Sequence, residues 1–389
     1  MTRTAHIAGA GIAGLATAAA LARQGWAVRV FERSPDLRVT GGGIGITPNG
    51  MKALDAIGVG DAVRTRAVVQ QEGGVRAPSG RWIAHSRLRF VEERYGESIR
   101  ALPRLELVRA LAGALPTGTI HFGAKVEPGG IGGLATSATI RVDGAQLEAD
   151  LVIGADGIRS ALRRAMHPGH SGLRHTGSAS WRSVVPAGGL ALVAAETWGA
   201  GLRLSILPLP DNTVHFSALA KLTGPRRTAG TYDGLVRLFG QWHDPIPQML
   251  QRAAAEELYF DEIEELIRPV DSFFAGRVVL LGDAAHPMTP NVGSANLALE
   301  DAVELAHAIA GAQSWDELRT GLAAYDASRR PRTARLSTMS RWMGRIAELS
   351  APAAVAARNG GVWLGGFLPE AVSRRSMDAM VGWSVPPVR

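Results

Sequence analysis

Short apolar runs alternate with longer helical stretches in the first part of the chain and again near its last third. An apolar run at 5–8 leads into an alanine-rich stretch at 15–22, and a second run follows at 27–31, which is a strand–helix–strand pattern. The runs at 151–153 and 277–281 are apolar throughout, as is typical of parallel strands buried on both faces. This pattern predicts an α/β fold built around a parallel sheet.

The pattern changes in the middle of the chain. Over the range 173–276, short strand-like segments such as 203–207 and 213–218 replace the alternation of strands and helices, and the range 70–96 is also polar and strand-like. Short strands separated by turns are typical of antiparallel sheets. We therefore expect a mainly antiparallel layer inserted into the α/β domain.

Several helices are predicted outside this layer. Apolar residues recur at helical spacing after Arg104 and over the range 296–309, and the chain beyond Pro331 is predicted to be helical with a loose, tryptophan-bearing tail. A glycine-rich loop at 41–45 precedes a short amphipathic helix that begins at Pro48. Such a loop can approach a bound cofactor closely, or it can be a simple connector.

The first strand and the first helix are joined by a glycine motif, Gly9-Ala10-Gly11-Ile12-Ala13-Gly14. This is the context that a dinucleotide-binding fingerprint requires. Gly9 permits the tight turn, Gly11 lets the backbone approach a pyrophosphate, and Gly14 lets the helix pack close to the strand. The phosphates would then lie at the helix N-terminus, where free N–H groups and the dipole favour negative charge.

The second strand ends at Glu32, close to the interval of about 20 residues at which this fold places a ribose-binding carboxylate. A carboxylate there would repel a 2′-phosphate, so FAD or NAD fits better than NADP. The alternative is that Glu32 is a solvated strand end.

Two later motifs follow buried strands: Gly154-Ala155-Asp156-Gly157 and Gly282-Asp283-Ala284-Ala285-His286-Pro287. Asp283 stands at the carboxyl end of its strand, where sheets of this kind bind ligands. Each glycine motif is weak evidence alone. In this order, the three indicate a single FAD held from several sides, whereas a plain Rossmann dehydrogenase would not account for the later two.

Composition narrows the chemistry. The 389 residues are 46% hydrophobic and 20% charged, which is ordinary for a globular enzyme, and there is no cysteine to form disulfides, thiolate nucleophiles or iron–sulfur centres. The net charge of +7 comes from arginines spread along the chain, so we expect no nucleic acid partner. No apolar run is long enough for a membrane span, and glycines interrupt the signal-like N-terminus, so we expect a cytoplasmic protein.

With these motifs the sequence resembles the single-component FAD-dependent aromatic hydroxylases, which include salicylate hydroxylase, 3-hydroxybenzoate 6-hydroxylase and para-hydroxybenzoate hydroxylase. The resemblance extends to about Arg335. It implies a Rossmann-like FAD-binding domain, an inserted, mainly antiparallel β-sheet substrate domain and a C-terminal helical segment. It also implies that NADH or NADPH reduces FAD, and that O2 then forms a C4a-hydroperoxyflavin that hydroxylates a small aromatic or polyketide-like substrate.

The resemblance also assigns cofactor contacts. Glu32 would hold the adenosine ribose, Arg33 would flank the adenine, and Arg104 would contact FAD near its phosphate and ribityl portion. Asp283 would bind the ribityl and pyrophosphate region, and Asp156 would act in FAD and nicotinamide binding. The full predicted cofactor set is Gly9, Gly11, Ala13, Gly14, Glu32, Arg33, Arg104, Asp156, Gly157, Gly282, Asp283, Pro290, Gly293, Ser294, Ala295, Asn296 and Leu297.

One stretch departs from the family pattern. Positions that often read Gly-Gln-Gly are Gly293-Ser294-Ala295 here, although Asn296 and Leu297 match residues that face the flavin ring in para-hydroxybenzoate hydroxylase. Backbone N–H groups at this helix start would stabilise negative charge on reduced flavin. A side chain on Ala295 changes how closely the backbone can approach the isoalloxazine.

The candidate catalytic residues are His215, Arg182 and Arg203. His215 is a candidate base for a phenol, and the two arginines are candidates to bind a carboxylate or phenolate through a planar fork. Each of the three has a structural alternative as an ordinary strand residue. Trp181 is expected in a core and His286 in a turn, and no metal site is predicted.

The predicted domain boundaries follow these patterns. The FAD-binding domain comprises 1–70, 97–172 and 277–330, the substrate layer comprises 71–96 and 173–276, and the C-terminal helical segment comprises 331–389. The protein is expected to be a monomer or a homodimer.

Two other activities stay open from the sequence. The same cofactor and fold support epoxidation or Baeyer–Villiger insertion, because fold does not fix the acceptor. A flavin-binding protein without oxygenase turnover is the third hypothesis, motivated by Gly293-Ser294-Ala295.

Overall fold

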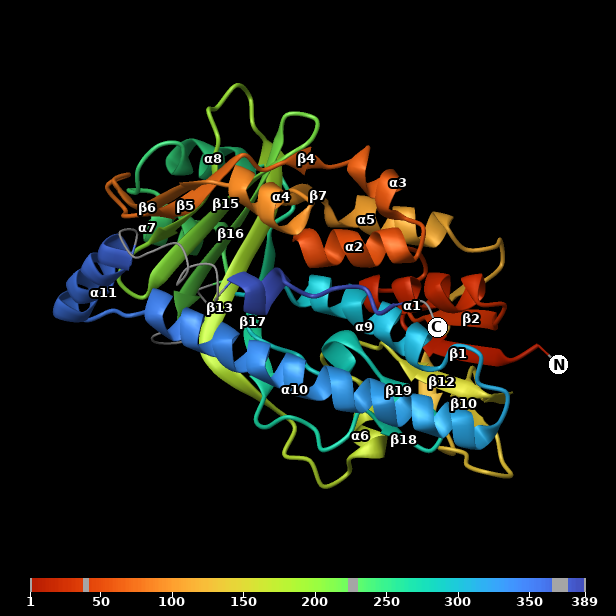
Figure 1. The fold of residues 1–389 in the computed structure, drawn as a ribbon. Coiled ribbons are helices and arrows are strands. Elements are labelled where there is room, and N and C mark those ends of the chain that lie inside the picture. The colour runs from red at the N-terminus through yellow and green to blue at the C-terminus, as the bar shows by residue number, and fades with distance from the viewer. Residues whose placement is uncertain (1, 38–41, 223–229, 366–376, 388–389) are drawn as a thin grey trace.

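The computed structural model describes residues 2–37, 42–222, 230–365 and 377–387. Its elements form two main sheets that lie at opposite ends of the molecule, with a long helix running beside both (Figure 1). This α/β architecture, with a mainly antiparallel sheet inserted between parallel strands, confirms the fold class predicted from the sequence.

The first sheet has six strands, and those at its centre are parallel. β1 pairs in parallel with both β2 and β12, and β12 pairs in parallel with β19. In spatial order the strands are β18 (Phe274–Ala275), β19 (Val278–Leu280), β12 (Leu151–Gly154), β1 (Thr4–Ala8), β2 (Ala27–Glu32) and β8 (Ile120–Phe122). The apolar runs predicted as buried strands therefore pair with one another, although they lie far apart in sequence.

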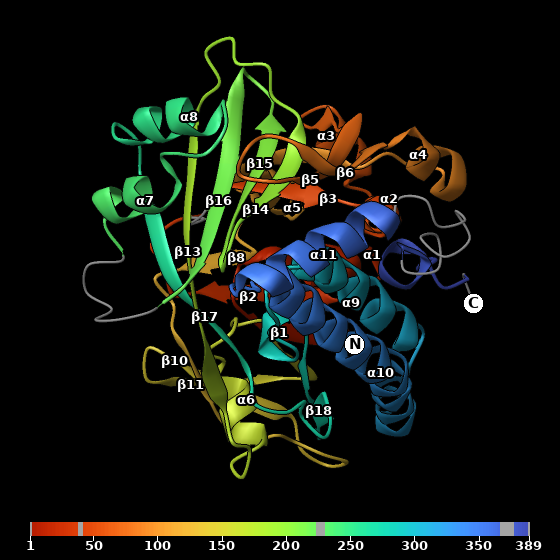
Figure 2. The same cartoon turned by 90° about the vertical axis from the view of Figure 1, so that its left-hand side faces the viewer.

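The second sheet has seven strands, and every neighbouring pair is antiparallel except β14 with β5. In spatial order they are β17 (Tyr259–Leu266), β13 (Leu173–Pro186), β16 (Thr213–Lys221), β15 (Leu202–Leu209), β14 (Ala194–Trp198), β5 (Glu72–Arg76) and β6 (Trp82–Arg87). The helices α7 (Tyr232–Phe239) and α8 (Ile246–Ala253) cover one face of this sheet (Figure 2).

Two small sheets complete the strands. One consists of β11 (Ala145–Ala149), β10 (Ala138–Val142) and β9 (Val126–Pro128), and the other of β3 (Gly43–Ile46), β7 (Arg100–Pro103) and β4 (Val68–Val69). The expected glycine-rich loop is thus partly a strand, because Gly43 and Gly45 belong to β3, which pairs with β7. Gly41 lies outside the described residues.

Helices pack around the parallel sheet and form the larger core with it. α1 (Ile12–Arg23) contacts α9 (Ser294–Ala308) closely. The other labelled helices are α2 (Pro48–Ala56), α3 (Gly60–Arg64), α4 (Arg89–Tyr95), α5 (Arg104–Gly113), α6 (Ala161–Met166), α10 (Trp315–Ala347) and α11 (Pro352–Gly365), with a 3₁₀ turn η2 (Gly282–Ala284). Residues 377–381 are also helical. Within the described ranges, no helix combines the length and the apolar character that crossing a membrane requires.

α10 begins much earlier than the sequence pattern indicated. A capping box of Ser314 and Glu317 starts it, and the helix continues through Pro331 to Ala347. A proline removes one backbone donor and normally ends or kinks a helix. Here Arg329 and Arg332, on either side of the proline, are ion-paired with acidic residues of α9, which holds the helix in place. The boundary predicted between residues 330 and 331 falls inside α10.

Candidate functional site

Residues from all three glycine motifs line one small cavity of about 150 Å³. The first motif contributes Gly11 and Ala13, the second Gly157, and the third Asp283. The complete lining is Gly11, Ile12, Ala13, Arg104, Ala155, Gly157, Asp283, Ser294, Ala295 and Ala298. Parallel strands end at the same edge of their sheet, so motifs that follow β1, β12 and β19 converge there. We refer to this cavity as the cradle.

The glycines of the first motif serve different purposes. A Cβ on Gly14 would lie 2.0 Å from the Gly9 carbonyl oxygen, and a Cβ on Gly9 would lie 2.5 Å from the Ala155 carbonyl oxygen. Gly9 also has a φ of +103°, which L side chains rarely adopt. A Cβ on Gly11, in contrast, would have nothing within 4 Å. Two glycines therefore permit backbone packing, whereas Gly11 borders open space in the cradle.

Glu32 is held in place at the end of β2. Its Oε2 accepts a hydrogen bond from the Ala10 backbone N–H at 2.8 Å, and its Oε1 accepts one from the Ser34 N–H at 2.9 Å. The carboxylate thus adjoins the fingerprint, as a ribose-binding group would require. Arg33 beside it is exposed, and neither residue lines the cradle.

One oxygen of the Asp156 carboxylate is hydrogen-bonded within the described part of the protein, and the other is not. Its Oδ2 accepts hydrogen bonds from the N–H groups of Ala161, at 2.7 Å, and Leu162, at 3.3 Å, at the start of α6. Its Oδ1 is buried, with no partner among the described residues. Gly157 follows with a φ of +79°. One acceptor on Asp156 thus remains for a ligand.

Arg104 and Asp283 bring opposite charges to the cradle. Burial lowers the pKa of the Arg104 guanidinium, while the nearby Asp283 carboxylate acts in the opposite direction. The Nε of Arg104 is buried, with no hydrogen-bond partner in the described part of the chain. Asp283 itself is exposed in the η2 turn, after Gly282, whose φ is +56°. Both residues line the cradle, so Arg104 offers an unpartnered donor and Asp283 an acceptor to a molecule bound there.

α9 begins at the cradle. Gly293 caps it with a φ of +74°, and Ser294 and Ala295 in its first turn line the cradle. The Asn296 side chain is buried, donating to the Gly45 carbonyl at 3.1 Å and accepting from the Thr47 N–H at 3.2 Å. Leu297 is buried in an apolar cluster. These two side chains therefore join α9 to neighbouring elements.

These features fit FAD. The cradle offers open space beside Gly11, the N-terminus of a 15-residue helix and an unpartnered buried donor on Arg104. Asp156 does not line the cradle, but it stands between the lining residues Ala155 and Gly157 and adds an unpartnered buried acceptor. Buried polar groups normally have hydrogen-bond partners, so both unpartnered atoms are available to a ligand. A pyrophosphate and polyhydroxyl chain supply the matching acceptors and donors.

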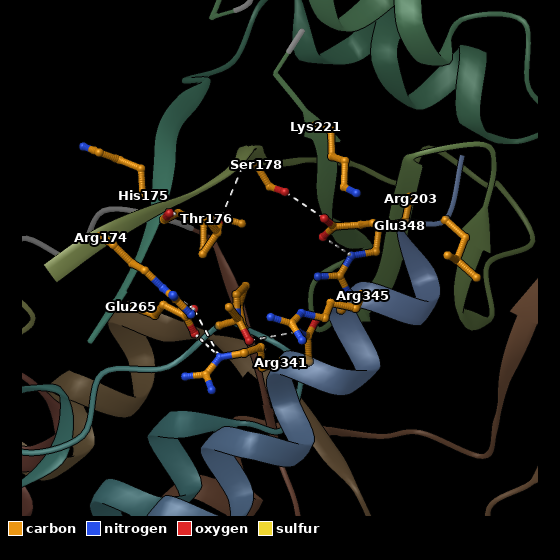
Figure 3. Close-up of a pocket in the computed structure, with 16 residues that line it drawn as sticks. Arg174, His175, Thr176, Ser178, Arg203, Lys221, Glu265, Arg341, Arg345 and Glu348 are labelled. Carbon is orange, nitrogen blue, oxygen red and sulfur yellow. Dashed lines mark hydrogen bonds and ion pairs between the residues drawn. The ribbon is translucent and has the colours of Figure 1, made fainter. Parts of the chain in front are cut away.

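A second, larger cavity of about 490 Å³ lies between the seven-stranded sheet and α10 (Figure 3). We call it the sheet cavity. Pro290 lines it rather than the cradle, together with Thr289 and Asn291. The loop 289–293 therefore borders the sheet cavity at one end and leads into α9 at the cradle at the other. Arg203 also lines the sheet cavity.

The three candidate catalytic residues share one face of the sheet. Arg182 pairs with Ser217 across β13 and β16, and Arg203 pairs with Leu219 across β15 and β16. His215 stands two residues from Ser217, and cross-strand partners and alternate residues project from the same face. Trp181 projects from the other face, where it is fully buried against Phe239 and Phe260, as expected for a core tryptophan.

His215 is buried between this face and the loop at Gly42. Its Nδ1 lies 3.0 Å from the Ser183 carbonyl oxygen, so Nδ1 carries the hydrogen and Nε2 is the acceptor of the neutral ring. Burial, and secondarily the Arg182 charge, lowers its pKa to about 4. Arg182 pairs with Asp261, and its Nε is buried without a hydrogen-bond partner in the described ranges.

Two sets of polar residues were not predicted from the sequence. One is a buried network around Asp301 and Arg329, and the other comprises Lys221, Arg341 and Arg345 in the sheet cavity. Part of the second set could have been recognised in the sequence, because Arg341 and Arg345 recur, with Glu348, at the spacing of one helix face. The first set leaves no comparable pattern, because its members come from separate segments.

Comparison of this chain with known proteins agrees with an FAD site at the cradle. A model of the FAD binding domain family matches residues 1–203 and 260–340. The chain is 35% identical to the aurachin C monooxygenase/isomerase of Stigmatella aurantiaca, over 84% of this chain and 85% of that protein. It is 34% identical to the 3-amino-4-hydroxybenzoate 2-monooxygenase of Streptomyces cremeus, over 88% and 86%. The crystal structure of Klebsiella pneumoniae HpxO complexed with FAD and uric acid superimposes with a TM-score of 0.85 at 26% identity, covering 98% and 96% of the two chains.

Proposed function

Because the chain belongs to the FAD binding domain family and is an FAD-dependent monooxygenase of the aromatic hydroxylase type, we propose that it hydroxylates a small aromatic or polyketide-like substrate with NAD(P)H and O2. The observation that carries the proposal is the convergence of three glycine motifs on the cradle, with a ligand-sized cavity on the other side of the loop 289–293. Cavities of this size are typical of small-molecule sites.

The cofactor contacts are assigned from the cradle. Gly11 and Ala13 would border the pyrophosphate, and Arg104 and Asp283 would supply a donor and an acceptor along the ribityl chain. Glu32, which adjoins the fingerprint outside the cradle, would bind the adenosine ribose. When bound, FAD would supply the redox chemistry between the nicotinamide nucleotide, as hydride donor, and O2, as the source of the oxygen atom added to an electron-rich ring.

His215 and Arg182 lie on the same sheet face as Arg203 but do not line the sheet cavity, and we propose that they orient the reacting part of the substrate. His215 is neutral near pH 7, so Nε2 can accept a hydrogen bond from a phenol hydroxyl and draw its proton away from the oxygen, which makes the ring more electron-rich. Arg182 is paired with Asp261, but its buried Nε has no partner among the described residues and could donate a hydrogen bond to the phenol oxygen. His215 and Arg182 are thus proposed as a base and an anion-stabilising residue.

The remaining expectations concern the setting of the reaction. We place the enzyme in the cytoplasm as a monomer or a homodimer, on the sequence pattern. Glu32 is proposed to bind the ribose of FAD and not that of the nicotinamide nucleotide. It therefore does not determine whether the enzyme uses NADH or NADPH, and the assay below includes both.

The decisive experiment is mass spectrometry of products after the FAD-loaded protein is incubated with NADH or NADPH, O2 and a panel of phenols, benzoates and quinones. A phenolic product heavier by one oxygen atom supports the proposal. A lactone or an epoxide would instead assign Baeyer–Villiger or epoxidase activity. Absence of NAD(P)H consumption with every compound would favour a flavin-binding protein without turnover.

A further inference from the structure

Large apolar side chains are exposed together where α10 and α11 meet. α11 lies beside the C-terminal end of α10, at the left of Figure 1 and toward the viewer in Figure 2, and Arg358 of α11 donates a hydrogen bond to the Ala347 carbonyl of α10 at 2.7 Å. We call the exposed apolar residues of the two helices the helix-end surface: Trp342, Met343, Ile346, Trp363 and Leu364. Apolar side chains that gather in this way mark an interaction site, whereas single exposed ones do not.

The two tryptophans distinguish this surface from the rest of the molecule. Trp342 is 60% exposed and Trp363 is 54% exposed, whereas the other seven tryptophans of the chain are buried or half-buried. A tryptophan ring that stays in water forgoes the stabilisation that burial would give it. Tryptophan is favoured at the interface of a lipid bilayer, because its ring enters the apolar region while its N–H group stays hydrated.

Cations share the exposed face of α10 with these apolar residues. Arg335, Thr338, Trp342, Arg345 and Ile346 recur at helical spacing along one face, and all five are exposed. Neither arginine forms an ion pair within the residues that the structure describes, so both charges are available to an anionic partner. The face therefore combines apolar contact with positive charge.

The segment that forms the two helix ends is basic. Between residues 327 and 365 the chain has seven arginines and a single carboxylate, that of Glu348, which is buried. Some of these arginines pair with carboxylates of other elements, but the two on the exposed face of α10 do not. A helix with arginines and tryptophan on its accessible side is typical of proteins that lie on anionic membranes.

The same charges argue against a second copy of this chain as the partner. A symmetric dimer contact uses the same surface patch on both copies. It would bring the Arg335 and Arg345 charges of one copy close to those of the other, and like charges across an interface weaken association. Anionic lipid headgroups would instead attract both arginines.

We infer that the helix-end surface binds to a membrane surface that contains anionic lipids. Trp342 and Ile346 would enter the region between headgroups and acyl chains. Arg335 and Arg345 would contact lipid phosphates beside them. Binding of this kind is peripheral, with the helices lying on the membrane rather than crossing it.

The position of the surface gives this binding a consequence for the enzyme. Gly344 and Arg345 line the sheet cavity, while Trp342 and Ile346 of the same helical turns do not. A membrane at the helix-end surface would therefore adjoin the α10 wall of that cavity. Apolar aromatic substrates dissolved in the lipid would then have a short path to it, a consequence that, unlike the membrane binding, rests on the proposed function.

The test is flotation of the FAD-loaded protein with lipid vesicles, without substrate or NAD(P)H. Vesicles of phosphatidylcholine mixed with phosphatidylglycerol should carry the protein, and vesicles of phosphatidylcholine alone should carry roughly tenfold less, because each cation adds to the attraction by anionic lipid. Raising the salt from about 0.1 M to about 1 M should release protein, since the Debye length falls from about 10 Å to about 3 Å. Absence of binding to the mixed vesicles at low salt would overturn the inference.

Apolar substitutions assign the binding to the helix ends. Trp342→Ser/Ile346→Ser should lower the partition coefficient on the mixed vesicles roughly tenfold or more, because two apolar side chains no longer enter the interface. Both residues are exposed, so the variant should fold and keep its FAD. Leu134→Ser is the matched control: Leu134 is 73% exposed before β10, far from α11 in Figure 1. Unchanged partitioning of the double variant would refute the assignment.

A charge reversal tests the electrostatic part. Arg335→Glu should weaken binding to the mixed vesicles roughly tenfold and leave binding to phosphatidylcholine unchanged. Arg319→Glu changes the net charge equally, but Arg319 is an exposed residue of α10 that lies about 24 Å away along the helix, so it should have little effect. Equal losses in both variants would show that total charge, and not this surface, governs the binding.

Sedimentation velocity without lipid identifies the alternative partner. A dimer that Trp342→Ser/Ile346→Ser dissociates, in a protein that binds no vesicles, would assign the surface to a second copy and overturn the inference. Because flotation needs no turnover, vesicle binding by a protein that oxygenates nothing would support the membrane surface and contradict the hydroxylase activity. Hydroxylation by a protein that never binds vesicles would do the reverse.

Discussion

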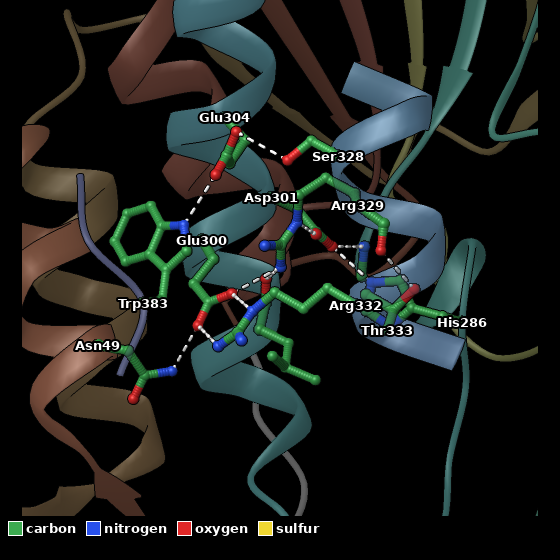
Figure 4. A network of polar contacts seen from close by, with 12 residues as sticks. Asn49, His286, Glu300, Asp301, Glu304, Ser328, Arg329, Arg332, Thr333 and Trp383 are labelled. Atoms are coloured by element: carbon green, nitrogen blue, oxygen red, sulfur yellow. Dashed lines mark hydrogen bonds and ion pairs between the residues drawn. The ribbon is translucent and has the colours of Figure 1, made fainter. Parts of the chain in front are cut away.

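Arg329 of α10 and Asp301 of α9 form an ion pair in which Nε lies 2.7 Å from Oδ1 and neither side chain is exposed (Figure 4). The other Asp301 oxygen accepts the Gly282 N–H at 2.9 Å and lies 2.6 Å from His286 Nε2. Arg329 also pairs with Glu300 at 2.8 Å. One buried network therefore connects α10 and α9 to the turn that carries Asp283.

Arg329→Met should lower the free energy of unfolding by about 3–5 kcal/mol, because it leaves two buried carboxylates without this partner. Chemical denaturation monitored by circular dichroism measures the change. Arg330→Met is the control: Arg330 is partly exposed and pairs with Asp326 one helical turn away, so its loss should cost less than about 1 kcal/mol. Equal effects of the two substitutions would contradict the role of the network.

Stability should fall as the pH decreases from about 6.5 to 4. Burial lowers the pKa values of both His215 and His6 to about 4, so in this interval the unfolded chain binds protons that the native state does not. Each histidine lowers the free energy of unfolding by up to about 3 kcal/mol. This loss is absent above pH 6.5, the pKa in the unfolded chain, and is nearly complete at about pH 4, the pKa in the folded protein.

The variant His215→Asn tests this pH dependence. Asparagine can still donate a hydrogen bond to the Ser183 carbonyl, but it does not titrate. Denaturation curves at several pH values should show a shallower slope than the wild-type protein between pH 6.5 and 4, whatever the change in absolute stability. A slope identical to that of the wild type would show that His215 does not titrate in this way.

Gly11 and Gly14 should respond differently to substitution. Gly11→Val places its side chain in open space beside the cradle, so the protein should fold but bind no FAD. Gly14→Ala brings a Cβ within 2.0 Å of the Gly9 carbonyl oxygen, so it should destabilise the fold itself, by about 1–3 kcal/mol. Flavin absorbance per protein and thermal denaturation distinguish the two effects. Normal FAD content in Gly11→Val would show that the fingerprint does not bind the cofactor.

Asp283→Ala should weaken FAD binding by roughly 10- to 100-fold, since an acceptor to the ribityl chain is lost. The side chain is exposed in η2, so the apoprotein should keep its stability. Quenching of flavin fluorescence measures the affinity, with Glu256→Ala as the control for loss of an exposed carboxylate elsewhere. Unchanged affinity would remove Asp283 from the proposed cofactor set.

Much of the cradle could be predicted because its parts are local. Gly11, Gly157 and Asp283 each come shortly after a strand that is recognisable from its apolar run, and the edge at which parallel strands end is common to all of them. The start of α10 could not be placed in this way. Pro331 indicates a boundary locally, but ion pairs of its neighbours with α9 keep the helix continuous.

The sequence alone determined the class of fold and cofactor, because the turn chemistry of the glycine motifs and the periodicity of the strands are properties of short segments. Only the tertiary structure decided that Arg203 lies buried beside Lys221 and Arg345, and that Arg329 meets Asp301. Such juxtapositions depend on strand register and on the packing of distant helices. They arise from many weak apolar contacts acting together, so no short stretch of sequence encodes them.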